Sequence, residues 1–351
     1  MATMRGVVLP GDRTVAFVDR SVPQPGHGEV VLAVEASGIC GSDIRAIYRG
    51  HVGDGAEGYR GVIAGHEPAG RVVAVGPGCA RPRVGDRVAV YHIAGCGVCE
   101  ECRRGYMVDC EGPGRAAYGW QRDGGHAPFL LADERTCVVL PESLTFVDGA
   151  LAACGFGTVH EALSRVGLSG RDRLFVVGLG PVGLGAAMLG RAMGAGPIIG
   201  ADVSAERCAQ ARRLGLVDVA VEAGDGESAL AVVMEGTGGR GCEVSIDCSG
   251  SGAGQLLAVR ATRTWGRCAL VGEGGRVTLD VSPLLIHKQI TLYGSWVTSL
   301  GNMERLLERL DRWGLHPEAV VTHRLPLSEA AEAYRVADAG QAGKVVLLPG
   351  A

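Results

Sequence analysis

The chain has 351 residues, of which 47% are hydrophobic and 21% charged, with a formal net charge of −4. The length predicts about two domains with sizeable cores, and the small net charge excludes a global attraction to nucleic acid or to a membrane surface. Of the 34 basic residues only Lys288 and Lys344 are lysines, which we interpret as compositional bias.

The beginning of the chain lacks the long apolar region of a secretory signal. The longest uncharged run, from Leu174 to Gly190, contains several glycines and Pro181 and is shorter than the span of about 20 apolar residues that a membrane helix needs. We therefore expect a cytoplasmic protein whose twelve cysteines are reduced. Clustered cysteines in such a protein indicate metal binding or catalysis.

Two motifs in the first 70 residues carry metal-binding residue types. Cys40 lies in GICGSDI (38–44) and His66 in AGHEPAG (64–70), and a thiolate and an imidazole are both good zinc ligands. Cys154, in LAACGFGT, is a third candidate, because two cysteines, one histidine and a solvent position form a catalytic zinc site. Asp43 would then hold the other ring nitrogen of His66. Taken singly, each residue is better explained as a core or turn residue, so the grouping is a hypothesis.

The segment GCGVCEECRRGYMVDC (95–110) carries four cysteines with the spacing C-x2-C-x2-C-x7-C, namely Cys96, Cys99, Cys102 and Cys110. Side chains at this spacing can converge on one tetrahedral Zn²⁺. The alternatives are an iron–sulfur cluster, a nucleic-acid zinc ribbon and four unrelated buried thiols. The mixed charge of the flanking residues argues against nucleic acid. Four thiolates leave no open coordination position, so we predict a structural site.

Residues 173–215 follow the order strand, glycine-rich turn, helix, strand and acid. An apolar run from Leu174 precedes the G-x-G-x-x-G motif GLGPVG (178–183), and an apolar helix follows to Met193. A second strand at 197–201 ends at Asp202, 19 residues after Gly183, close to the roughly 20 expected of a carboxylate that binds ribose hydroxyls. This order predicts a dinucleotide site.

Each glycine of the motif has a separate function in such a site. Gly178 allows the tight turn, Gly180 lets the backbone approach a pyrophosphate, and Gly183 lets helix and strand pack closely. The negative charge of Asp202 would repel a 2′-phosphate, so NAD is favoured over NADP. Arg207 weakens this preference slightly, because a guanidinium there can reach a phosphate.

Further candidate strands alternate with helices along the following segment, at 217–221, 243–247, 267–272 and 290–294. About six alternating strands predict a doubly wound parallel sheet of the Rossmann type.

Together these motifs resemble the zinc-dependent medium-chain dehydrogenase/reductase family of alcohol and polyol dehydrogenases, over essentially the whole chain. CGSD, GHE, the four-cysteine segment, CGFGT and GLGPVG occur in family order at family spacing. The resemblance implies a GroES-like β-rich catalytic domain, residues 1–153 and 296–351, with a structural-zinc lobe at about 95–111. A Rossmann NAD-binding domain, residues 154–295, would be inserted in it, with zinc and nicotinamide in the cleft between them.

The resemblance also implies roles for single residues. Two zinc ions per chain and NAD are the expected cofactors. The catalytic zinc would take Cys40, His66 and Cys154, with Glu67 beside the metal or as an alternate ligand, and the structural zinc would take Cys96, Cys99, Cys102 and Cys110. Ser42 would accept the proton of the alcohol and Asp43 would orient His66. Cofactor contacts would come from Thr158, Gly178, Gly180, Val182, Gly183, Asp202 and Arg207.

The chain departs from the family pattern in the proton relay and in the third zinc ligand. Many relatives carry a relay histidine where this chain has Arg45, and His51 cannot simply replace it, so we expect the proton to leave through water or the ribose hydroxyls. The third ligand is Cys154 where sorbitol-type enzymes often have Glu, which loosens assignment to a polyol subclass.

The expected reaction is hydride transfer between NAD and a secondary alcohol or ketone. His92 occupies a position that lines the substrate pocket in relatives, and Tyr91, Trp120, Gln121, Arg122 and His126 lie near the pocket or are ordinary loop residues. Polar groups there favour a polyol, sugar or (amino)cyclitol. The alternatives are a simple alcohol dehydrogenase, an aldehyde or ketone reductase, and an NADPH quinone reductase.

The expected partners are a small-molecule alcohol or ketone and further copies of the chain, with no nucleic acid or membrane. The segment 277–296 resembles the region through which relatives form dimers, so we expect a homodimer or homotetramer.

Overall fold

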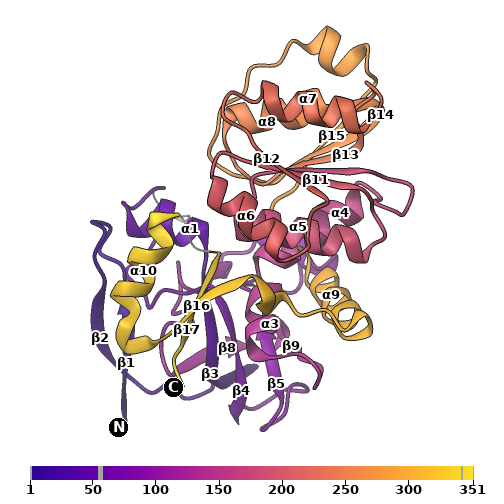
Figure 1. Cartoon of the computed structure of the whole chain (residues 1–351). Coiled ribbons are helices and arrows are strands. Elements are labelled where there is room, and N and C mark those ends of the chain that lie inside the picture. Colours follow the sequence, from indigo (N-terminus) through magenta and orange to yellow (C-terminus); the bar gives the residue numbers. More distant parts are fainter. Residues whose placement is uncertain (1, 54–57, 341–342, 351) are drawn as a thin grey trace. The chain divides into compact units, whose positions relative to one another are not determined.

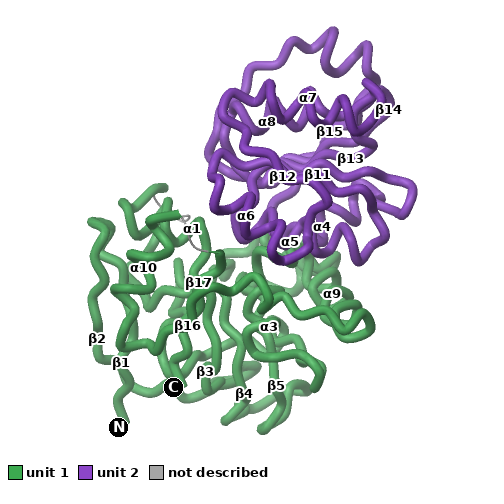
Figure 2. Tube along the Cα trace, viewed as in Figure 1, with its two compact units in different colours: residues 1–157, 298–351 green, residues 158–297 purple. Residues whose placement is uncertain are grey.

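The computed structural model describes residues 2–53, 58–340 and 343–350. The chain divides into two compact units, Met1–Gly157 with Thr298–Ala351 and Thr158–Val297 (Figure 2). The first boundary lies a few residues after the expected one, because helix α3 (Phe146–Ala152) packs on the sheet of the first unit and keeps Cys154 there. That the units act as catalytic and cofactor-binding domains stays a prediction.

The first unit is rich in β-structure (Figure 1). Its strands are β1 (Thr3–Val8), β2 (Ala16–Ser21), β3 (Glu29–Ile39), β4 (Glu67–Val75), β5 (Arg87–Val90), β6 (Ile93–Ala94), β7 (Ala116–Ala117), β8 (Phe129–Asp133), β9 (Cys137–Val139), β16 (Val321–Pro326) and β17 (Lys344–Leu348). Its helices besides α3 are α1 (Gly41–Asp43), α2 (Glu100–Arg103), α9 (Leu300–Trp313) and α10 (Ala330–Ala339), and α4 (Gly155–Arg165) contains the boundary between the units.

The main sheet of this unit has the order β16-β17-β3-β4-β5-β9, and β8 also pairs with β3. The long central strand β3 pairs antiparallel with β17, β4 and β8. The motif that contains Cys40 follows directly after β3, and the motif that contains His66 leads into β4. The C-terminal strand β17 pairs with β3 on the side opposite β4. The sheet therefore brings three distant segments of the chain together at one place.

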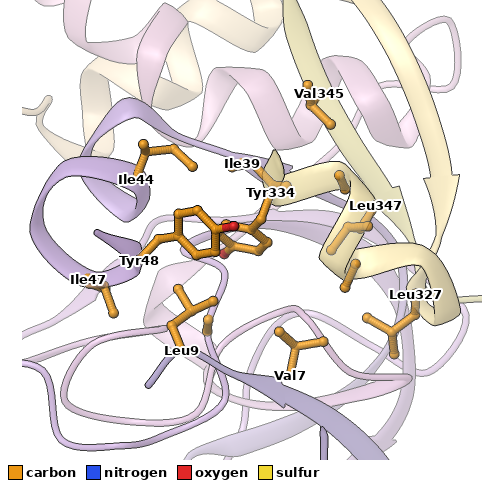
Figure 3. Packing of buried hydrophobic residues seen from close by; sticks show 13 residues of the cluster. Val7, Leu9, Ile39, Ile44, Ile47, Tyr48, Leu327, Tyr334, Val345 and Leu347 are labelled. Atoms are coloured by element: carbon orange, nitrogen blue, oxygen red, sulfur yellow. The ribbon is translucent and has the colours of Figure 1, made fainter. Parts of the chain in front are cut away.

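A hydrophobic cluster fixes the segment after Cys40. The π-helical turn Ile44–Tyr48 packs against α10, and the ring centroids of Tyr48 and Tyr334 are 5.2 Å apart (Figure 3). Leu9 and Val345 belong to the same buried cluster. Burial of apolar surface is the dominant favourable term in folding, so packing on the C-terminal segment holds in place the turn that directly follows Asp43.

The second unit is a six-stranded sheet of order β12-β11-β10-β13-β14-β15 in which every pairing is parallel. The strands are β10 (Leu174–Val177), β11 (Ile198–Asp202), β12 (Val219–Glu222), β13 (Cys242–Asp247), β14 (Thr262–Leu270) and β15 (Thr291–Gly294). The helices are α5 (Pro181–Ala192), α6 (Ala205–Arg213), α7 (Glu227–Gly236) and α8 (Gly252–Ala261).

Helices cover both faces of this sheet, with α5 and α6 on one side and α7 and α8 on the other (Figure 1). The prediction of a doubly wound parallel sheet inserted in a β-rich domain is confirmed. The strand order reverses at β10, which lies between β11 and β13, and open parallel sheets bind ligands at such a switch point. Among the described residues, no helix combines the length and apolar character needed to cross a membrane.

Candidate metal and dinucleotide sites

The structure brings Cys40, His66, Glu67 and Cys154 to one point of the first unit, with one donor atom of each within 4.8 Å of all the others. Cys40 follows β3, His66 directly precedes β4, Glu67 is the first residue of β4, and Cys154 follows α3. Four donors from three separate segments converge because β3, β4 and α3 pack against one another.

Asp43 holds two of these residues in position. Its carboxylate is fully buried; Oδ1 lies 2.8 Å from Nδ1 of His66, and Oδ2 accepts the backbone N–H of Cys40 at 2.9 Å. Because a carboxylate only accepts hydrogen bonds, Nδ1 of His66 carries the proton of this contact. Nε2 then has the lone pair that can bind a metal ion. Burial opposes protonation of His66, but Asp43 and Cys40 outweigh it and raise the pKa of the imidazole.

The donor set suits tetrahedral zinc. The sulfur atoms of Cys40 and Cys154 are 3.9 Å apart, close to the roughly 3.8 Å between two thiolates that bind one zinc at about 2.3 Å. The Cys154 thiol lowers the pKa of Cys40, while sharing that hydrogen bond raises the pKa of Cys154. Together with His66, the two sulfurs have the Cys₂His composition found in zinc sites that keep a fourth position open.

Glu67 has a partner that sequence reasoning missed. Nζ of Lys344 lies 2.7 Å from Oε1 and 2.6 Å from Oε2 of Glu67, and both side chains are buried. Burial raises the pKa of Glu67 to about 7 against the opposing charge of Lys344. Burial also acts against the charge of Lys344, but Glu67 outweighs it and raises the lysine pKa. The signal available in the sequence was the rarity of lysine, which we interpreted as compositional bias.

The four cysteines of the 95–110 segment also converge, with donor atoms within 4.8 Å of one another. The sulfurs of Cys96 and Cys102 are 4.0 Å apart. Backbone N–H groups of Val98 and Cys99 donate to the Cys96 sulfur at 3.5 and 3.3 Å and lower its pKa to about 6. Burial instead raises the pKa of Cys102 to about 12. The arrangement suits a closed tetrathiolate zinc site, the geometry of a structural ion.

Asp148, His316 and Glu318 form a third group of donors in the first unit. Nδ1 of His316 lies 2.8 Å from Asp148, whose other oxygen accepts the backbone N–H of Glu318 at 2.8 Å. Glu318 also pairs with Arg324 at 3.0 Å. Asp148 completes the capping box of α3 through the backbone N–H of Thr145. Protein groups already satisfy these carboxylates, so this group fastens α3 to the turn after α9.

In the second unit the G-x-G-x-x-G turn follows β10. Gly178 has φ +88°, and a Cβ there would lie 2.7 Å from the backbone nitrogen of Ser249. A Cβ at Gly183 would overlap the carbonyl oxygen of Gly178. At Gly180 the nearest atom to a Cβ is Nη1 of Arg207, at the ordinary contact distance of 3.7 Å. The fold therefore needs glycine at 178 and 183, whereas no protein atom would clash with a Cβ at 180.

Asp202 ends β11 and is tied to the same turn. Oδ2 accepts the backbone N–H of Leu179 at 2.7 Å, and Oδ1 accepts that of Ser204 at 2.9 Å. Nη1 of Arg207 lies 3.4 Å from Oδ2. The carboxylate thus stands beside the N-terminus of α5, which begins with Pro181 and Val182. Thr158 lies on α4, at the start of the second unit.

The structure places the three residues considered for proton transfer, Ser42, Arg45 and His51, in different environments. Ser42 is partly buried on α1, between Cys40 and Asp43. Arg45 is exposed on the following turn. Nε2 of His51 lies 2.9 Å from the carbonyl oxygen of Leu9, and its ring meets Tyr59 edge-on. His51 is therefore engaged in the packing of its own loop.

Of the pocket candidates, His92 contacts the donor set. Its ring centroid is 5.2 Å from that of His66, and its Nδ1 lies 2.8 Å from the carbonyl oxygen of Ala153. Burial lowers the pKa of His92 to about 4, so the ring is neutral and Nδ1 donates. The other candidates have contacts that serve packing. The hydroxyl of Tyr91 donates to the carbonyl of Thr298, the side-chain oxygen of Gln121 accepts the backbone N–H of Ala117, and the hydroxyl of Tyr334 is hydrogen-bonded to His126. Trp120 packs on the hydrophobic cluster of Figure 3, and the guanidinium of Arg122 lies over the ring of Tyr118.

Comparison with known proteins gives consistent matches. Residues 26–142 match the family of alcohol dehydrogenase GroES-like domains, and residues 181–312 match the zinc-binding dehydrogenase family. The uncharacterized zinc-type alcohol dehydrogenase-like protein YphC of Escherichia coli (strain K12) is 47% identical, over 99% of both chains. Sorbitol dehydrogenase of Bombyx mori is 31% identical over 97% of each chain. The solved structure of alcohol dehydrogenase TADH from Thermus sp. ATN1 has a TM-score of 0.88 and 28% identity, covering 98% of this chain and 99% of that one.

Proposed function

Because the chain belongs to the zinc-dependent medium-chain dehydrogenase/reductase family of alcohol and polyol dehydrogenases, we propose that it transfers a hydride reversibly between NAD and a secondary alcohol or its ketone. The observation that carries the proposal is the open donor set of Cys40, His66 and Cys154 in a chain that also contains a G-x-G-x-x-G turn. Holding both reactants on one protein supplies the proximity term of catalysis.

In this proposal Cys40, His66 and Cys154 hold the catalytic zinc. The ion, when bound, supplies Lewis-acid chemistry that lowers the pKa of an alcohol hydroxyl. Ser42 would accept the hydroxyl proton while passing its own proton on, so that it acts as a relay. Asp43 fixes the ring orientation and tautomer of His66 through the 2.8 Å contact. Glu67 stands beside the ligands. With Arg45 exposed and His51 engaged by Leu9, we propose that the proton leaves through water or the cofactor ribose.

The cysteines at 96, 99, 102 and 110 hold a second, structural zinc in the proposal. The support is their convergence and the N–H···S hydrogen bonds, which favour the thiolate form that binds metal. A closed site of this kind contributes folding free energy directly. Its absence should loosen the lobe without changing the ligands of the catalytic site.

We propose NAD rather than NADP as the cofactor. Asp202 places a negative charge beside the glycine turn, where it can accept hydrogen bonds from ribose hydroxyls and repel a 2′-phosphate. Gly180 leaves the approach to the N-terminus of α5 open, where a pyrophosphate binds. Val182 would pack on the cofactor, Thr158 would lie near the nicotinamide, and Arg207 would stand beside the adenosine ribose.

His92 supports a polyhydroxylated substrate, such as a polyol, sugar or (amino)cyclitol. Because Nδ1 donates to the Ala153 carbonyl, Nε2 is an acceptor. A substrate hydroxyl next to the reacting carbon can donate to it, whereas a simple alcohol has no such group. The similarity to a sorbitol dehydrogenase agrees with this class.

Two measurements test the proposed function. Purified protein with NAD is offered sorbitol, myo-inositol, an aminocyclitol, glucose, ethanol and 2-propanol, and the appearance of NADH is followed by absorbance. We expect turnover of a polyhydroxylated member of the panel and greater activity with NAD than with NADP. Cys40→Ala should abolish turnover but keep NAD binding, while Cys268→Ala, at a buried cysteine of the second unit, should keep both. Full activity of the Cys40 variant would contradict the proposal.

We also propose that the chain forms a homodimer or homotetramer in the cytoplasm. Strand β15 is an edge of the parallel sheet, and Ile286, Leu292 and Trp296 in or near it are exposed. An exposed edge strand offers unpaired backbone N–H and C=O groups with which another chain can pair. Leu292→Lys should shift the sedimentation velocity toward the monomer. The cytoplasm suits a protein whose cysteines must stay reduced to bind metal.

A further inference from the structure

The ion pair between Lys344 and Glu67 lies directly beside the proposed catalytic donor set. Lys344 is the first residue of β17 and Glu67 the first of β4, and both strands pair with β3. Gly38 of β3 makes room for them: a Cβ there would overlap Oε2 of Glu67 and lie 3.1 Å from Cε of Lys344. The pair is thus built into the sheet.

Lysine is an exception in this chain, since 32 of its 34 basic residues are arginines once Lys288 and Lys344 are subtracted. A lysine ammonium is a compact point charge, whereas the wide guanidinium fork of arginine needs more room. Nζ lies within 2.7 Å of both oxygens of Glu67. A single ammonium therefore lies at ion-pair distance from both carboxylate oxygens in the space beside Gly38. It hydrogen-bonds Oε1, and the buried Oε2 has no hydrogen-bond partner among the described residues.

The charges around the donor set explain why a cation is needed there. Two thiolates and the carboxylates of Glu67 and Asp43 together exceed the charge of a divalent ion by two negative charges, and Lys344 offsets the one on Glu67. Buried charge without a partner is costly. Without Lys344, the nearest positive charge to the Glu67 carboxylate would be the bound ion itself, and Glu67 already belongs to the group within 4.8 Å.

We propose that Lys344 is a positioning residue that holds Glu67 beside the metal ion and so keeps the fourth coordination position open for the alcohol. This inference rests on the proposed function, because it assumes an ion on Cys40, His66 and Cys154. Removal of Lys344 frees Glu67 to close the site as a fourth protein ligand.

The test uses the full chain with Co²⁺ in place of zinc, because the visible bands of cobalt report its coordination. Imidazole is the probe of the open position, and its dissociation constant is measured from the band shift. We compare wild type with Lys344→Met, Glu67→Gln and the double variant. Lys288→Met is the matched control, since Lys288 binds the carbonyls of Arg260 and Thr262 in the second unit. Lys344→Leu, which also offers no donor to Glu67, replaces it should Lys344→Met fail to fold.

We expect Lys344→Met to weaken imidazole binding by about 10–100-fold, the range for partners of metal ligands, and to change the cobalt bands before imidazole is added. The double variant should recover the wild-type response, because it has no carboxylate to close the site. Lys288→Met should respond as wild type, and the double variant should match Glu67→Gln.

An unchanged imidazole response in Lys344→Met, or in Lys344→Leu where it replaces it, overturns the role of Lys344 and leaves the proposed function intact. A loss that the double variant does not recover also overturns it, because Glu67 is then not the closing ligand. A wild-type protein whose cobalt bands ignore imidazole contradicts the open site itself, and with it both proposals.

Discussion

Replacing Asp43 by asparagine tests how the first unit positions its zinc ligands. The carboxylate accepts one N–H on each oxygen, from His66 at 2.8 Å and from the Cys40 backbone at 2.9 Å. Asparagine offers one oxygen and one NH₂ group, so one of the two donors then faces another donor. The variant is nearly isosteric, which confines the change to one hydrogen bond and one charge.

The lost contact sets the expected magnitude. A hydrogen bond to a charged group contributes about 1.5–3 kcal/mol, and a tenfold change in affinity corresponds to about 1.4 kcal/mol. We therefore expect Asp43→Asn to weaken binding of one of the two zinc ions by about 10–100-fold, in agreement with the range for groups that orient metal ligands. Zinc affinity is measured by competition with a chelator, and the free energy of unfolding by guanidinium denaturation.

Asp148→Asn is a matched control in the same unit. Asp148 is also fully buried and accepts N–H groups from a histidine and from backbone, but it lies outside both proposed zinc sites. It should lose a similar free energy of unfolding while both zinc affinities stay as in wild type. Unchanged zinc affinity in Asp43→Asn, or an equal loss in Asp148→Asn, would refute the reasoning.

Three further predictions concern the dinucleotide turn, the cysteine lobe and pH. Gly180→Ala should raise the NAD dissociation constant about tenfold or more (about 1.4 kcal/mol or more) without altering the melting temperature. Gly183→Ala should instead lower the free energy of unfolding by about 1–3 kcal/mol through overpacking. Calorimetry that finds Gly180→Ala destabilised with unchanged NAD binding would contradict the proposed site. Cys102→Ser should lower the zinc content by one ion per chain in metal analysis and lower the melting temperature by several degrees. The hydrogen bond with Asp148 raises the pKa of His316, so its stabilisation is complete below about pH 6.5 and is lost as pH rises through the raised pKa. The side chain is 41% exposed, so the effect should be below about 1 kcal/mol, and His316→Gln should remove that slope from the pH dependence of unfolding; an unchanged slope would assign it to another group.

Some features could be predicted because their information is local. The strand, glycine turn, helix, strand and acid of residues 173–215 follow from short periodic patterns, and the structure has β10, α5 and β11 within a residue or two of the expected bounds. Four cysteines within fifteen residues can reach one point through a few turns, whatever the remaining chain does. The family could be identified because all five motifs occur in their expected order.

Tertiary structure decided the rest, because it depends on contacts between distant segments. Cys40, His66 and Cys154 each have an ordinary explanation alone, and only the pairing of β3 with β4 and the packing of α3 bring them within reach of one ion. No pattern links Lys344 to Glu67, 277 positions earlier, and nothing local assigns His51 to Leu9 rather than to a proton relay. Local backbone preferences are encoded in neighbouring residues, whereas the partner of a buried charge is set by which strands lie side by side.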